Sequence, residues 1–285
     1  MPDACPYHLV FETAPPRDAS ALRTHDEIPR PFVIAPPPAR ADDYPAGSAV
    51  TFDLTLIGRA RDFLPHFVVT LREVDRIGRG RRSVMLRRIE AVHPLSEARE
   101  GVYTSDSNLV TPRDSSITLA DCATLPCPAG PVRVTFVTQT RLKEGGGLGR
   151  RSGFARRPEF QLLFRRLLGR LSSMARFHGD GPLDIDFRGL IEAAASVRLV
   201  RDDTQWTHWA RYSGRQDRRM EWEGVVGPVV YEGALSAFWP YLVFGQWTHV
   251  GSGTTFGLGG YRIAPDSTTT SPVTVACKAQ ERAGH

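Results

Sequence analysis

The residues best suited to chemistry lie in one glycine-rich stretch near the C-terminus, residues 249–263. Glycine adopts backbone angles closed to other residues and lets a ligand approach the main chain, so such a run suits a loop whose amides hold phosphate. An ordinary glycine-rich turn is the alternative. The candidate ligand-binding residues of this stretch are Gly251, Ser252, Gly253, Thr254, Gly257, Gly259 and Gly260.

The elements on either side of this stretch decide which kind of loop it is. Residues 237–247 predict a helix that Ser236 caps, with Pro240 in its first turn, and residues 261–263 predict a short strand. The order is therefore helix, loop, strand, whereas Walker and dinucleotide-binding loops run strand, loop, helix. The glycine spacing fits neither motif, so we expect no nucleotide cofactor.

Arginine is concentrated in two blocks of the chain. Residues 141–176 contain ten basic and two acidic residues, a net charge of +8, and residues 76–88 contain six arginines and no acid. Because the whole chain has a net charge of only +5, the positive charge is segregated. Guanidinium groups suit phosphate and stacked bases, which favours a polyanionic partner over a merely solvated basic face. The predicted binding arginines are Arg150, Arg151, Arg156, Arg157, Arg165, Arg166, Arg170 and Arg176.

Length and composition indicate a two-domain protein of ordinary globular type. The chain has 285 residues, of which 41% are hydrophobic and 24% charged. No apolar run approaches the roughly 20 residues of a membrane span, so we expect a cytoplasmic protein without membrane contact. Cys122 and Cys127 lie five residues apart, but Cys5 and Cys277 do not complete a zinc set, and we expect no metal site.

The first half of the chain repeats the element order of the second. Residues 49–57 alternate as a strand does, residues 63–77 predict a helix capped by Asp62, and residues 83–89 predict another strand. The triplet at residues 63–65 matches that at 238–240 at an offset of 175, and residues 77–80 match 250–253 at an offset of 173. A proline early in the helix and a Gly-x-Gly sequence after the helix recur together in both halves. This recurrence indicates an internal duplication. Residues 1–49 predict extended segments, among them residues 8–11 and 31–34.

The second half predicts the ferredoxin-like order βαββαβ. The order rests on a strand at residues 132–140, helices at 158–177 and 187–195, a strand at 197–200, and residues 220–232 as a strand pair turned at Gly227-Pro228. We therefore predict an α+β chain with tandem ferredoxin-like (RRM-like) domains. The predicted domains are residues 1–128, incomplete at the N-terminus, residues 129–263 with the glycine-rich loop, and a polar, disordered tail at residues 264–285.

At residues 249–263 the sequence resembles the CRISPR-associated repeat-RNA processing endoribonucleases of the RAMP superfamily. The loop of that family runs His-Val-Gly-x-Gly-Thr and Phe-Gly-x-Gly between a helix and a strand, and residues 249–254 and 256–259 reproduce it. Further matching motifs are Ile57-Gly58-Arg59-Ala60, Met174-Ala175-Arg176-Phe177-His178-Gly179, Gly224-Val225-Val226-Gly227 and Val230-Tyr231-Glu232-Gly233. The resemblance runs from Cys5 to Ile263 but lacks the usual first strand and helix of the family, where the catalytic histidine commonly lies.

The resemblance implies a metal-independent endoribonuclease that binds CRISPR repeat RNA, as a stem-loop or a single strand, and cuts the precursor transcript into guide RNAs. A base takes the proton of a ribose 2′-hydroxyl, whose oxygen attacks the adjacent phosphorus. His178 and His249 are the catalytic candidates, although a histidine at a helix end is otherwise a hydrogen-bonding or dipole partner. The alternative is a non-catalytic guide-RNA-binding subunit that associates with other CRISPR effector subunits.

The remaining candidates have weaker sequence support. His66 has a tyrosine counterpart in the duplication and is interpreted as a packing residue, and no context supports His8, His25, His93, His208 or His285. Trp206, Trp209 and Tyr212 could stack bases or pack against the core. A small-molecule enzyme lacks any metal, cofactor or nucleophile signature. We expect valine at Gly257 or Gly259 to impair RNA handling before it impairs solubility.

Overall fold

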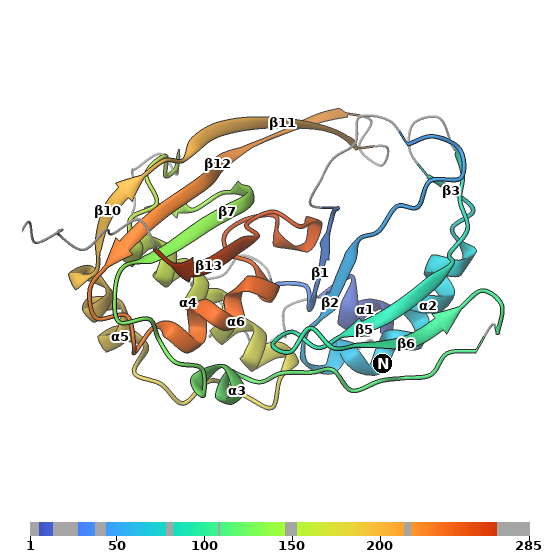
Figure 1. Ribbon diagram of the computed structural model, residues 1–285, viewed down its shortest axis with the longest axis horizontal. Helices are drawn as coiled ribbons and strands as arrows, with labels where there is room; N and C mark the ends of the chain where they lie inside the picture. The colour runs from blue at the N-terminus through green and yellow to red at the C-terminus, as the bar shows by residue number, and fades with distance from the viewer. Residues whose placement is uncertain are drawn as a thin grey trace, which may run out of the picture.

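Four strands form the centre of the C-terminal half: β7 (Val132–Thr140), β10 (Arg198–Asp202), β12 (Arg218–Glu232) and β13 (Tyr261–Pro265). In the computed structural model they lie side by side in the order β10-β12-β7-β13, and every neighbouring pair is antiparallel (Figure 1). The structure describes residues 6–13, 28–37, 44–77, 82–107, 109–145, 153–213 and 218–266.

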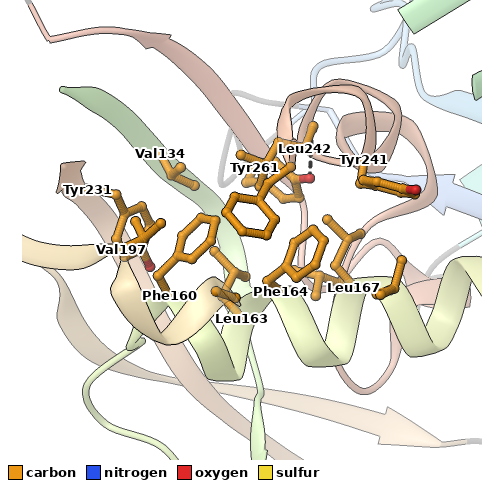
Figure 2. Packing of buried hydrophobic residues seen from close by; sticks show 14 of the residues in the cluster. Val134, Phe160, Leu163, Phe164, Leu167, Val197, Tyr231, Tyr241, Leu242 and Tyr261 are labelled. Atoms are coloured by element: carbon orange, nitrogen blue, oxygen red, sulfur yellow. Dashed lines mark hydrogen bonds between the residues drawn. The ribbon is translucent and has the colours of Figure 1, made fainter. Parts of the chain in front are cut away.

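Three helices join these strands: α4 (Phe160–His178), α5 (Phe187–Ala193) and α6 (Trp239–Thr248). The apolar residues of α4 recur every three or four positions, so one helical face is buried against the sheet and α6. Figure 2 shows Phe160 and Phe164 from α4 packed with Tyr231 and Tyr261 from the sheet. The order of strands and helices confirms the ferredoxin-like fold of this half.

The predicted strand pair at residues 220–232 is wrong. Gly227-Pro228 lies inside one continuous strand, β12, at a register irregularity against β7. A Cβ at Gly227 would lie 2.9 Å from the carbonyl oxygen of Asp203, so the glycine permits a close backbone approach instead of a turn. The hairpin partner of β12 is instead β11 (Gln205–Ser213). The β11–β12 hairpin extends beyond the body of the sheet (Figure 1).

The N-terminal half repeats the later part of this arrangement. A hairpin of β1 (Phe32–Ala35) and β2 (Asp53–Leu56) precedes α2 (Leu64–Glu73), which carries a proline in its first turn as α6 does. The small core of this half contains Val10, Phe32 and Phe67. The chain therefore has a tandem ferredoxin-like fold, as predicted.

Several N-terminal expectations are wrong in detail. Residues 8–11, predicted as extended, lie mostly in α1 (Pro6–Val10). The predicted strand at residues 83–89 is divided between β4 (Arg82–Ser83) and β5 (Arg88–Val92). Neither predicted cap acts as one, because α2 and α6 begin after Phe63 and Phe238, which make no side-chain capping bond.

The other elements are short. They are η3 (Gly58–Phe63), β3 (Arg76–Ile77), β6 (Arg99–Thr104), α3 (Leu119–Ala123), β8 (Lys143–Glu144), β9 (Gly153–Phe154), η4 (Ala194–Ser196) and η5 (Thr254–Phe256). No helix among the described residues is long and apolar enough to span a membrane. Strand β13 continues two residues into the segment predicted as a tail, and residues 267–285 lie outside the described residues.

Candidate RNA-binding loop and arginine helix

The glycine-rich loop is held along the end of strand β7. The amide of Gly259 donates to Gln139 at 3.1 Å, the amide of Ser252 donates to Arg141 at 3.1 Å, and the amide of Gly260 donates to the Thr138 hydroxyl at 2.8 Å. These bonds continue the β7–β13 ladder past the regular strands. The path of the loop is therefore set by the sheet.

The second half of the loop is buried. Gly257 and Gly259 have positive φ angles of 81° and 72°, which L-residues rarely adopt. A Cβ at Gly257 would lie 2.7 Å from the Ile34 carbonyl oxygen of β1, and one at Gly259 would lie 1.8 Å from the Val250 carbonyl oxygen. Gly260 is buried beside the ring of His249. These three predicted RNA-binding glycines shape the loop and offer little surface to a ligand.

The first half of the loop is partly exposed to solvent. Gly251, Ser252 and Gly253 are partly exposed, and Gly251 and Gly253 have φ angles of 87° and 80°. Within the part of the chain that the structure describes, the amides of Gly251, Gly253 and Thr255 have no hydrogen-bond acceptor. Amides without an acceptor beside left-handed glycines can bind an anion. Thr254, another predicted contact, is buried.

Both catalytic candidates are buried histidines bonded to main-chain carbonyls. The Nδ1 of His249 lies 3.1 Å from the Leu258 oxygen, and the Nε2 of His178 lies 2.7 Å from the Pro29 oxygen. Each residue is 6% exposed. Burial lowers the pKa of His249 to about 4 and lowers the pKa of His178. These contacts support structural positions for both rings, and their catalytic role stays a prediction.

The free energy of unfolding should decrease as the pH falls from about 6.5 toward 4, partly because of His249. In this interval the unfolded chain binds a proton that the buried ring does not bind, which costs up to about 1.4 kcal/mol per pH unit. Because asparagine does not titrate, His249→Asn should flatten this dependence in urea unfolding at pH 7 and pH 5. His66→Asn, at an exposed site, is the control. An unchanged slope in His249→Asn would contradict the assignment.

The predicted arginines divide into exposed and bound groups. Arg165 and Arg176 are exposed on α4, and Arg157 is exposed but pairs with Glu159. Arg156 is also exposed, and its guanidinium lies over the ring of Trp206. Arg150 and Arg151 lie outside the described residues.

Arg166 and Arg170 support the structure from the same helix. Arg166 donates to the Lys143 carbonyl from both Nε (2.9 Å) and Nη2 (2.6 Å). The Nε of Arg170 donates to Thr248 at 2.8 Å, at the C-terminus of α6, where a cation interacts favourably with the helix dipole. Burial lowers the pKa of Arg170 to about 9. Arg170 therefore holds the helix end from which the glycine-rich loop departs.

Arg165→Ala should weaken RNA binding without destabilising the protein. The side chain is exposed, so its removal deletes a phosphate-binding cation and little packing. The slope of log affinity against log salt should fall by roughly one for each phosphate that the variant no longer neutralises. Arg188→Ala, which removes an exposed arginine paired with Glu192 on α5, is the matched control. Equal affinity and slope in the wild type and Arg165→Ala would exclude this arginine from the RNA-binding face.

Sequence reasoning missed two residues that adjoin the loop. Arg141 accepts the Ser252 amide through its carbonyl and stacks its guanidinium 4.2 Å above the ring of Phe154. Trp222 of β12 packs its ring 5.4 Å from that of Phe256 in η5. Arg141 could have been found as the first arginine after a confident strand. Trp222 could not, because its contact depends on the register of β12.

The three aromatic residues predicted to stack bases or pack all lie on β11. Trp206 is half-buried on β11 and packs against the core, while Trp209 and Tyr212 lie farther along the same strand. Cys122 is buried, Cys127 is partly buried, and both are free thiols. Among the described residues, no three His, Cys, Asp or Glu side chains gather as metal ligands.

Comparison with known proteins gives two family matches. Residues 134–261 match the family described as CRISPR-associated endoribonuclease Cas6, and residues 1–115 match a family described as an N-terminal domain. The predicted boundary after residue 128 falls between these two intervals and stays a prediction. No curated protein matches the sequence.

Solved structures also resemble this chain. A Cas6 product complex has a TM-score of 0.59 and 16% sequence identity over 86% of this chain and 85% of that chain. A second Cas6 product complex has a TM-score of 0.48 and 17% identity over 86% of each chain. Cas6 of Thermus thermophilus has a TM-score of 0.47 and 14% identity over 82% of this chain and 79% of that chain. The first likeness shows the fold.

Proposed function

We propose a function from one premise: residues 134–261 belong to the CRISPR-associated endoribonuclease Cas6 family, as the loop motifs indicate. The chain binds CRISPR repeat RNA and processes the precursor transcript into guide RNAs. Cleavage proceeds without a metal ion, by attack of a ribose 2′-hydroxyl on the adjacent phosphorus. RNA is the first partner, and other CRISPR proteins are further partners.

The observation that carries this proposal is the open half of the glycine-rich loop. Gly251, Gly253 and Thr255 are partly exposed residues whose amides have no acceptor among the described residues, and the β7 ladder fixes the loop that contains them. Fixed donors of this kind also stabilise the charge that develops on a phosphorane. Arg165 and Arg176 provide exposed positive charge on α4, a helix packed against α6 in the same domain. Binding of this type recognises RNA mainly by backbone and shape.

A second candidate function is a guide-RNA-binding subunit that does not cut. The burial of His178 and His249 favours it, because neither ring is placed to exchange protons with a ribose. In that case the loop and the arginines hold the processed RNA for an effector complex. The two functions share the binding face and differ in the chemistry.

Incubation with labelled repeat RNA in EDTA separates the two functions. Cleavage should yield a 5′ fragment that ends in a 2′,3′-cyclic phosphate and a 3′ fragment that begins with a 5′-hydroxyl. RNA with a single 2′-deoxy substitution at the cleaved position is the control, and it should bind and remain intact. A stable complex of uncut RNA would instead support the binding subunit, and weak binding that does not distinguish the repeat from a scrambled RNA would contradict both.

A further inference from the structure

Two side chains fasten the buried half of the glycine-rich loop. From β7, the Thr138 hydroxyl donates to the Gly257 carbonyl at 2.7 Å and accepts the Gly260 amide at 2.8 Å. From the end of α6, the Nδ1 of His249 lies 3.1 Å from the Leu258 carbonyl oxygen. Because a carbonyl oxygen only accepts, Nδ1 carries the hydrogen of this bond. We call Thr138 and His249 the loop clamp.

The two side chains of the loop clamp meet at Gly260. A Cβ at this position would lie 3.0 Å from the Cε1 of His249 and 3.1 Å from the Oγ1 of Thr138. Any residue with a side chain would have to displace one of these two groups. The glycine therefore permits the close approach of the imidazole and the hydroxyl to the loop backbone.

The backbone of His249 is strained. Its φ of 61° and ψ of 173° fall in a region that residues other than glycine rarely adopt. Such strain persists only where the surrounding structure determines it, and it is concentrated at catalytic and ligand-binding sites. Here the His249 amide donates to Gly245 at 2.8 Å, and the ring bonds to Leu258. Glycine would relieve the strain and lose the bond from the ring, so the strained histidine indicates that the ring contact serves the loop.

The loop clamp acts on the partly exposed half of the loop through Gly257. The carbonyl of Gly257 bonds to Thr138, while its amide donates to the Thr254 carbonyl at 2.9 Å. In the same turn, η5, the amide of the last residue donates to the Gly253 carbonyl at 3.0 Å. The amides of Gly253 and Thr255, which have no acceptor among the described residues, therefore belong to a turn that the clamp anchors.

We propose that Thr138 and His249 are positioning residues for RNA binding: they hold the amides of Gly253 and Thr255 in the arrangement that binds an RNA phosphate. This inference rests on the proposed function and gives the buried half of the loop a part in it. A donor that is already fixed loses little freedom on binding, whereas a loop with several arrangements binds in proportion to the competent fraction. Both side chains act through the loop and do not contact the RNA.

Thr138→Val removes the hydroxyl and nearly preserves the shape of the side chain. The buried Gly257 carbonyl and Gly260 amide lose this partner, so the loop should sample other arrangements. The dissociation constant of a 2′-deoxy repeat RNA should rise by about 5-fold or more, and amide exchange of residues 257–260 should accelerate in the free protein. The salt dependence of binding should keep its wild-type slope, because no cation is removed. Thr138→Ser, which keeps the hydroxyl, should restore most of the affinity.

Thr135→Val is the matched control, because Thr135 lies on the same strand opposite Arg262 of β13 and outside the loop. It should bind RNA with wild-type affinity. On the other side of the clamp, His249→Asn should bind more tightly than His249→Ala, since the asparagine amide can donate in place of Nδ1. Urea unfolding of each variant gives its folded fraction, so that a loss of affinity through global unfolding is recognised.

The other outcomes overturn the proposal in distinguishable ways. Wild-type affinity in Thr138→Val, beside wild-type protein that binds the repeat, would exclude the positioning role and leave the proposed function intact. A loss that the folded fraction accounts for, or an equal loss in Thr138→Ser, would restrict Thr138 to a structural role. Wild-type protein that does not distinguish the repeat from a scrambled RNA would overturn the proposed function together with the positioning role.

Discussion

Valine at position 259 should strongly destabilise the C-terminal domain. The backbone there has a φ of 72°, and a Cβ would lie 1.8 Å from the carbonyl oxygen of Val250. A left-handed backbone conformation alone costs a residue with a side chain roughly 1–2 kcal/mol. The clash adds to this cost, because Val250 is held in place by the hydrogen bond from its amide to the Gly259 carbonyl. The expectation from sequence, that RNA handling would fail before solubility, is therefore replaced by a loss of stability.

Alanine substitutions make this prediction quantitative. Gly145 has a φ of 70° but nothing within 4 Å of its Cβ position, so Gly145→Ala contains the strain without the clash. Chemical unfolding should show a loss of about 1 kcal/mol for Gly145→Ala and a clearly larger loss for Gly259→Ala. Equal losses in the two variants would mean that the loop adjusts to the added methyl group, and would contradict a path fixed by β7.

Phe164→Ala should lower the free energy of unfolding by about 3–5 kcal/mol. The Phe164 ring is fully buried, and its centre lies 4.7 Å from that of Phe238 and 5.7 Å from that of Tyr241. It packs α4 against the segment that leads into α6, which ends at the glycine-rich loop. Its removal should therefore also loosen the loop relative to the arginines of α4.

Denaturant unfolding of Phe164→Ala and Phe187→Ala measures this contribution. Phe187 is 39% exposed at the start of α5, so its truncation removes an aromatic ring of equal size from a poorly packed position. The control should cost well under half as much as Phe164→Ala. Similar losses for the two variants would mean that the α4 aromatic cluster does not hold the helices together.

The C-terminal fold could be predicted from sequence because its elements have clear periodicity. Strand β7 has the predicted bounds, and the apolar spacing of α4 predicts its buried face. The β11–β12 hairpin could not be predicted in this way. A Gly-Pro pair usually indicates a turn, and only the neighbouring Asp203 backbone shows that Gly227 marks a bulge within β12.

The candidate site could be predicted in part. The motif identifies the glycine-rich loop, but sequence cannot tell partly exposed glycines such as Gly251 from buried ones such as Gly259. The same holds for Arg165 and Arg170, which lie on one helix with opposite environments.

Amide hydrogen–deuterium exchange with and without repeat RNA tests the central claim most directly, because it reports on the loop itself. In the free protein, Gly251, Gly253 and Thr255 should exchange rapidly, since their amides lack acceptors among the described residues. Saturating repeat RNA should protect the peptide covering residues 250–256. Residues 257–260, already hydrogen-bonded, should change little. Unchanged exchange at residues 250–256 in a saturated complex would contradict RNA binding by the glycine-rich loop.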